Sequence, residues 1–131
     1  VRVLPAVAPA DLLAWVGSAD VAAMPILPTT LNHRLSTPNK LFEAIAAGVP
    51  VVASDLPGMA PIVRSIDAGR LVDPTNPAAI AAGLRAVLDA PPAEQAARRE
   101  RLLGAARDTY NWAVQSEQLF AEFGRLTQRP W

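Results

Sequence analysis

The sequence contains no cysteine, and His33 is its only histidine. These absences exclude a disulfide framework and a zinc site built from cysteine and histidine. Charge of one sign is also missing, because 12 basic residues balance 12 acidic ones and no long basic run appears. A dedicated nucleic-acid-binding protein would carry such a run, so we expect no nucleic-acid partner. Lysine is the scarcest cation, with Lys40 as its single occurrence.

What is present is apolar and regularly punctuated. Of the 131 residues, 51% are hydrophobic, and 13 prolines and 7 glycines interrupt them. This composition is typical of one folded α/β domain, or part of one, and not of a disordered segment. The chain starts without methionine or a signal segment and has no apolar run of membrane-spanning length. We therefore expect a cytoplasmic chain that is an excerpt of a longer one.

Short apolar runs alternate with helical patterns along the first half of the chain. Buried strands are expected at residues 1–4, 21–24, 51–53 and 70–72, and helices at 10–17, 38–47 and 58–65. The alternation predicts an α/β fold, a Rossmann-like parallel sheet flanked by helices. Only helical patterns follow the turn cluster at 73–77, over residues 77–88, 93–108 and 112–126. We expect one domain, 1–131, with strand–helix units over 1–76 and a helical tail over 77–131.

The polar segment 36–43 opens a helix and carries the only lysine. Thr37 is expected as the N-cap and Pro38 as the first helical residue, and Gly48 should end the helix in a left-handed conformation. The loop before this helix leaves the carboxyl end of the second strand, where open parallel sheets bind their ligands. Backbone N–H groups and the helix dipole favour an anion there, and a phosphate is the natural candidate.

Lys40 and Glu43 lie three residues apart and share one face of this helix. A nucleoside diphosphate could place its phosphates against Lys40 and the first-turn N–H groups, with Glu43 accepting from the ribose hydroxyls. The alternative is an ordinary surface ion pair on a helix whose cap is only structural. The two residues alone leave both interpretations open.

The wider string of motifs resembles the C-terminal, donor-binding domain of GT-B-fold retaining glycosyltransferases of the group-1 type. It comprises Ala19-Asp20-Val21, residues 36–43, residues 46–58, residues 69–74 and Tyr110-Asn111-Trp112. The resemblance implies that Glu43 binds the donor ribose and that Lys40 and Asn39 lie by the diphosphate or sugar. Lys40 and Glu43 are the expected catalytic residues. Ser36, Thr37, Pro38 and Asn39 join them in holding a nucleotide diphosphate sugar, without a metal ion or other cofactor.

The sequence departs from that family in two places. Most members have a second glutamate eight positions before Glu43, where this chain has Leu35, which leaves Ser36, His33 and Arg34 as local substitutes. Two strand–helix units that would lie between strands 1–4 and 21–24 are also absent. We expect either that strand 1–4 does not form or that a second copy of the chain completes the sheet as a homo-oligomer.

Besides sugar transfer from a nucleotide diphosphate sugar, the sequence is compatible with other functions. A nucleotide-sugar epimerase shares the architecture, and a non-catalytic Rossmann-like oligomerisation module remains open. Glu43 and Asp55 lack the spacing of a glycosidase acid pair. The arginines of 93–108 leave open a peripheral membrane contact at the inner face, although the interleaved acids favour a solvated helix. The acceptor is not named by the sequence, and the isolated chain is expected to bind nucleotide weakly and to catalyse nothing.

Overall fold

The computed structural model describes residues 2–127 and contains a three-stranded parallel sheet. Its strands are β1 (Ala22–Met24), β2 (Val51–Ser54) and β3 (Gly69–Val72), in the order β1-β2-β3. The central strand β2 pairs Val52 with Ala23 on one side and with Arg70 on the other. All four residues of β2 are buried. The expected α/β class with a parallel sheet is confirmed.

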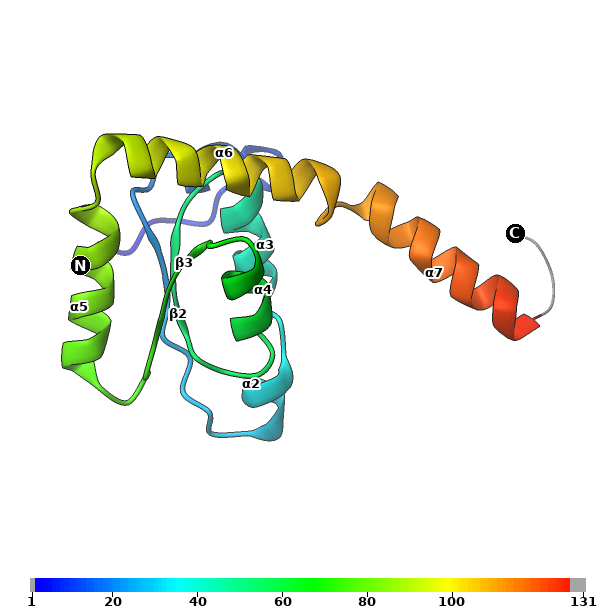
Figure 1. The fold of residues 1–131 in the computed structure, drawn as a ribbon, viewed down its shortest axis with the longest axis horizontal. Helices are drawn as coiled ribbons and strands as arrows, with labels where there is room; N and C mark the ends of the chain where they lie inside the picture. Colours follow the sequence, from blue (N-terminus) through cyan, green and yellow to red (C-terminus); the bar gives the residue numbers. More distant parts are fainter. Residues whose placement is uncertain (1, 128–131) are drawn as a thin grey trace.

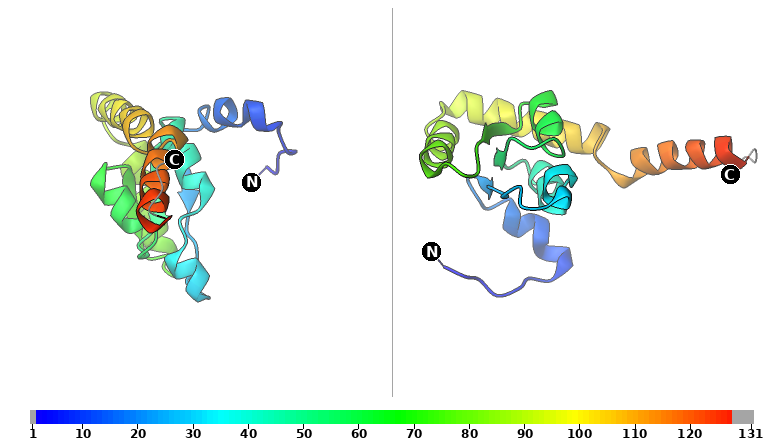
Figure 2. Two further views of the ribbon diagram at one scale, coloured as in Figure 1. Left: turned by 90° about the vertical axis from the view of Figure 1, so that its right-hand side faces the viewer. Right: turned by 90° about the horizontal axis from the view of Figure 1, so that it is seen from below.

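Helices cover both faces of this sheet (Figure 1). One face carries α3 (Asn39–Ala46) and α4 (Ala60–Ser65). The helix α1 (Leu12–Val16) packs beside α3 and is preceded by the short 3-10 helix η1 (Pro9–Asp11). The other face carries α5 (Pro77–Leu88), which packs on β2 and β3. Helix α6 (Pro92–Asp108) lies across α3, and α7 (Trp112–Thr127) extends away from the body (Figure 2). Among residues 2–127, no helix has the length and apolar character needed to cross a bilayer.

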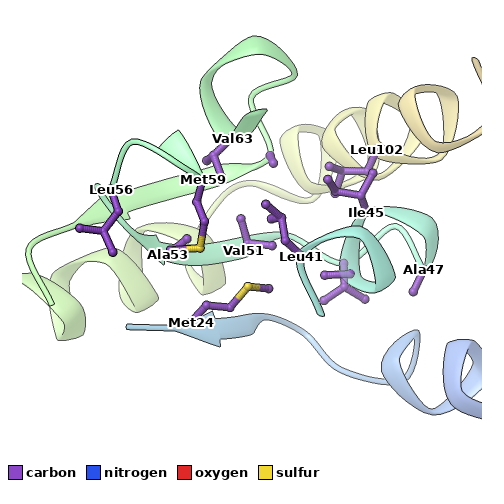
Figure 3. Close-up of a cluster of buried hydrophobic side chains, with 13 residues drawn as sticks. Met24, Leu41, Ile45, Ala47, Val51, Ala53, Leu56, Met59, Val63 and Leu102 are labelled. Atoms are coloured by element: carbon purple, nitrogen blue, oxygen red, sulfur yellow. The ribbon is translucent and has the colours of Figure 1, made fainter. Parts of the chain in front are cut away.

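The core follows from the alternation of side chains along β2. Val51 and Ala53 point into the larger cluster, where Leu41 and Ile45 of α3 meet Leu102 of α6 (Figure 3). The intervening Val52 points to the opposite face and packs with Val72 and Val87. Successive strand residues face opposite sides of a sheet, so one short strand contributes to both clusters.

Gly48 turns the chain from α3 into β2. Its φ is 69°, a left-handed conformation that glycine adopts without the cost of a Cβ. The Gly48 N–H donates to the Ile45 carbonyl (3.0 Å) and the Val49 N–H donates to the Ala44 carbonyl (2.8 Å). This is the Schellman pattern of a helix end, and it confirms the predicted role of Gly48.

The predicted strand at 1–4 is wrong for residues 2–4, which form no regular element. Val1 lies outside the described residues, as do residues 128–131 of the predicted helical tail. A β-strand needs a neighbour for its backbone hydrogen bonds, and among residues 2–127 the sheet consists of β1, β2 and β3 alone. In the part of the chain that the structure describes, β1 pairs with β2 alone.

The loop after β1 contains a helix that the sequence analysis did not predict. Helix α2 (Leu31–Leu35) is one turn long, and its N-cap Thr30 accepts a hydrogen bond from the His33 N–H at 3.1 Å. A cap threonine followed by residues without proline or glycine is the signal that could have indicated it. Boundaries elsewhere shift by one or two residues, so that α4 begins at Ala60 and α6 at Pro92.

Arg98 is a buried cation on α6. Its side chain is 2% exposed, and its Nη2 lies 2.6 Å from Glu94 and 3.9 Å from Asp67. Asp67 also binds Arg101 from the same helix. Within residues 2–127, the Nε and Nη1 atoms of Arg98 have no hydrogen-bond partner. The charge of this guanidinium is therefore balanced mainly by Glu94.

Glu94→Gln should destabilise the protein by about 1–3 kcal/mol, because it removes the closest negative charge from a buried cation. Urea unfolding measures this loss. Glu100→Gln is the matched control, since Glu100 is exposed on the same helix and forms no ion pair among the described residues. The control should change the unfolding free energy by less than about 0.5 kcal/mol. Equal effects of the two substitutions would contradict this role of Glu94.

Candidate functional site

The candidate site lies where the strands end, beside α2 and the start of α3 (Figure 1). The loop 25–37 leaves the carboxyl end of β1, passes through α2 and enters α3. Helix α6 crosses the opposite end of the sheet (Figure 1). The structure therefore confirms that the polar segment 36–43 lies at the carboxyl edge of the sheet. In open parallel sheets, this is the edge that binds ligands.

The start of α3 differs from the prediction in a way that matters for binding. Pro38, not Thr37, is the N-cap, and no side chain caps the helix. The Thr37 hydroxyl instead donates to the Gly58 carbonyl at 3.1 Å. A proline at the cap position offers no side-chain oxygen, so no side chain satisfies the first-turn N–H groups. Pro38 is accordingly not the first helical residue, which is Asn39.

Two backbone N–H groups remain for a ligand at this helix start. The Leu41 N–H donates to the Pro38 carbonyl at 2.9 Å. In the described part of the chain, the N–H groups of Asn39 and Lys40 donate to no acceptor. Both residues are exposed. Together with the Lys40 ammonium, these N–H groups form a local concentration of donors and positive charge.

Glu43 is half-buried one turn further along α3, and Lys40 is exposed. Neither takes part in any ion pair found within residues 2–127. The alternative of an ordinary Lys40–Glu43 surface pair is thus not what the structure forms. Both charges remain available to a ligand. Ser36 and Thr37 are half-buried, at the junction between α2 and α3.

The three residues considered as local substitutes lie on or next to α2. His33 Nδ1 is 2.9 Å from the Thr29 hydroxyl, on an exposed surface. Arg34 is exposed, and its carbonyl accepts from the Gly58 N–H at 3.1 Å. Leu35, which stands where most family members have glutamate, is 57% exposed. The structure therefore brings these residues to the site edge, but within residues 2–127 the His33 ring has no carboxylate partner that would mark it as a base.

Other carboxylates at this edge are already engaged. Both oxygens of Asp55 bind Arg64, at 2.7 and 2.8 Å. The Asp73 carboxylate accepts from the Thr75 hydroxyl (2.7 Å) and the Thr75 N–H (2.8 Å). These bonds lower the pKa of Asp73, the hydroxyl contributing more than the N–H, because they favour the charged form. The lowered pKa of Asp73 disfavours the protonated acid that a glycosidase requires, and the Asp55 carboxylate is held by Arg64.

A cavity in the described part of the chain lies elsewhere. It has a volume of about 510 Å³ and is lined by residues that precede the strands, such as Asp20 and Pro50, together with Arg98 and Arg99 of α6. This is the amino-terminal edge of the sheet, opposite to the start of α3. Because parallel sheets bind ligands at their carboxyl ends, we place the candidate site at α3 and not in this cavity.

Residues 1–90 match the family model described as glycosyl transferases group 1. The chain belongs to this family. It is 35% identical to the D-inositol 3-phosphate glycosyltransferase of Geodermatophilus obscurus over 93% of this chain and 25% of that protein. It is 36% identical to the enzyme of the same name from Thermomonospora curvata, over 85% of this chain and 24% of that one.

A second group of relatives is named phosphatidyl-myo-inositol mannosyltransferase. The one from Mycobacterium leprae is 38% identical over 60% of this chain and 21% of its own length. No solved structure matches. The chain thus spans about a quarter of the length of the curated relatives it matches. The resemblance to group-1 glycosyltransferases is confirmed, and the matched residues include the whole segment 36–43.

Thr75→Val should raise the pKa of Asp73 towards its ordinary value, because it removes the hydroxyl that stabilises the carboxylate. A lowered native pKa makes a stabilising contribution that is present at neutral pH and is lost as the pH falls through that native pKa. NMR titration of the Asp73 carboxyl carbon measures the change. Thr109→Val, at an exposed threonine outside this turn, should leave the Asp73 curve in place. An unchanged Asp73 pKa in Thr75→Val would show that the hydroxyl does not act in solution.

Proposed function

We propose that this chain is the donor-binding part of a glycosyltransferase, which transfers a sugar from a nucleotide diphosphate sugar to an acceptor. The observation that carries the proposal is the uncapped start of α3, where the only lysine stands next to two open N–H groups. This helix start lies at the carboxyl edge of the sheet and within the residues that match the family. The open N–H groups, the position at the carboxyl edge of the sheet and the family match all point to this helix start.

The proposed roles follow from chemistry and position. The N–H groups of Asn39 and Lys40 and the Lys40 ammonium bind the diphosphate, since each donates to anionic oxygen. Glu43 lies one turn along the same face and accepts hydrogen bonds from the ribose hydroxyls. Ser36, Thr37 and Pro38 form the approach to the helix and shape the wall beside the phosphates.

The same groups assist the reaction. Departure of the nucleoside diphosphate builds negative charge on the phosphate oxygens, and donors already aimed at that position stabilise the charge as it develops. Because Lys40 and the helix start supply positive charge, we assign no metal ion to the diphosphate. Retention of the anomeric configuration is what the family resemblance implies. The acceptor would bind mainly to the part of the protein that lies outside this chain.

The surroundings of α6 bear on the membrane contact that the sequence left open. Arg98 is buried, Arg101 binds Asp67, and Arg99 donates to the carbonyls of Ala47 and Gly48. Three of the arginines that suggested a membrane surface thus bind groups within the protein. This favours the interpretation of the rest of the exposed α6 surface as a solvated helix face. Cytoplasmic location and a homo-oligomer formed through the incomplete sheet stay predictions. No observation favours the epimerase or the oligomerisation module, and the relatives reported above are named as transferases.

Titration of this chain with UDP-glucose and with GDP-mannose, followed by amide-resolved NMR, should shift the signals of residues 36–43. Lys40→Ala should weaken that binding by about tenfold or more, because a charge-assisted hydrogen bond to phosphate is lost. Arg85→Ala is the control, since Arg85 is an exposed cation on α5, on the other face of the sheet. Shifts that survive in Lys40→Ala but vanish in Arg85→Ala would refute the proposed site.

Glu43→Ala should weaken binding of UDP or GDP by about tenfold but leave binding of inorganic diphosphate unchanged. The reason is that only the nucleotides carry the ribose hydroxyls that Glu43 is proposed to bind. The same NMR titration gives both dissociation constants. Glu117→Ala, at an exposed glutamate of α7, should affect neither ligand. If Glu43→Ala weakened both ligands equally, Glu43 would be acting on the phosphate end and not on the ribose.

A further inference from the structure

The segment 54–58, which begins at the last residue of β2, holds both ends of loop 25–37, the loop that leads to the candidate site. At the near end, the Ser54 side chain is fully buried, and its hydroxyl lies 2.8 Å from the Ile26 carbonyl and 3.3 Å from that of Met24. A hydroxyl has one proton to donate, so the shorter contact to Ile26 is the principal bond. This bond fixes the start of loop 25–37 to the central strand.

Gly58 holds the far end of the same loop through its backbone. Its N–H donates to the Arg34 carbonyl at 3.1 Å, and its carbonyl accepts from the Thr37 hydroxyl at 3.1 Å. The backbone around Gly58 lies so close to the backbone of residues 35 and 36 that a Cβ on residue 58 would be 2.5 Å from the Leu35 carbonyl oxygen. It would lie closer still to the Ser36 carbonyl oxygen. No side chain fits there unless residues 34–37 move away.

The segment that makes these contacts is itself fixed in the core. Leu56 and Met59, on either side of Gly58, are buried in the same cluster as Leu41 and Ile45 of α3. The open N–H groups of Asn39 and Lys40 stand two and three residues after Thr37. Their position therefore depends on where the Thr37–Gly58 hydrogen bond places the chain before the helix. Loop 25–37 has few buried residues of its own to set that position.

We propose that Ser54, Gly58 and Thr37 are positioning residues for the donor diphosphate, and that segment 54–58 is the template against which the start of α3 is aligned. None of the three need touch the ligand. Thr37 acts by donating to Gly58, and not as a helix cap. The inference rests on the proposed donor site, whose ligand it takes as a nucleoside diphosphate.

Thr37→Val removes the hydroxyl and keeps the shape, and Thr37→Ser keeps the hydroxyl. Thr37→Val should weaken binding of UDP-glucose or GDP-mannose by about fivefold, the effect of losing one neutral hydrogen bond. Thr37→Ser should bind these nucleotide sugars as tightly as the unmodified chain. Ser54→Ala should act in the same direction as Thr37→Val. Val87→Ala is the control for stability alone, because Val87 is buried on the opposite face of the sheet. It should lower stability without changing the affinity of the folded protein.

Ligand-free spectra separate this inference from the donor site itself. In Thr37→Val and Ser54→Ala, the amide signals of Asn39 and Lys40 should move, and the Gly58 N–H should exchange faster with solvent; in Val87→Ala these signals should stay in place. If they stay in place in all the variants, the positioning role is wrong, whatever binds. If they move but the unmodified chain shows no shifts with either nucleotide sugar or with inorganic diphosphate, the positioning holds and the proposed donor site fails.

Discussion

Every residue of β2 is buried, and the remaining elements are arranged around this strand. It pairs with β1 and β3, supplies Val51 and Ala53 to the core beneath α3 and α4, and supplies Val52 to the contact with α5. Burial of a valine side chain such as that of Val51 or Val52 contributes about 1.5–3 kcal/mol, relative to an exposed position. Gly48 ends α3 and leads into β2, and Ser54 at the end of β2 holds the start of loop 25–37. The two ends of this strand are therefore linked to the end of α3 and to the start of the loop that precedes α3. A substitution that unpairs β2 would therefore remove the site together with the fold.

The site itself depends on an incomplete helix end. A threonine or serine cap would have satisfied one of the first-turn N–H groups of α3 from within the protein and left less for a ligand. Pro38 in the cap position leaves the N–H groups of Asn39 and Lys40 open, and Thr37 turns its hydroxyl to Gly58 instead. The arrangement gives up a capping hydrogen bond on α3 and gains a site that is rich in donors. Lys40 adds the one lysine of the chain to this point.

Much of this could be predicted from the sequence, because its signals are local. Apolar runs bounded by proline and glycine located β1, β2 and β3, and Gly48 was predicted as the left-handed residue it is. The strand expected at 1–4 failed because a strand requires partners, and the sequence of one segment does not contain them. Thr37 failed as a cap because its alternative partner, Gly58, is twenty-one positions away and becomes a neighbour only in the fold. Ser54 was missed for the same reason, since its partners Met24 and Ile26 belong to another strand and loop.

A structure of this chain with UDP or GDP bound would test the central claim most directly. The account predicts that the diphosphate oxygens lie within hydrogen-bonding distance of the N–H groups of Asn39 and Lys40, at the carboxyl edge of the sheet. A diphosphate bound instead in the cavity beside Arg98 and Arg99, at the opposite edge, would contradict it.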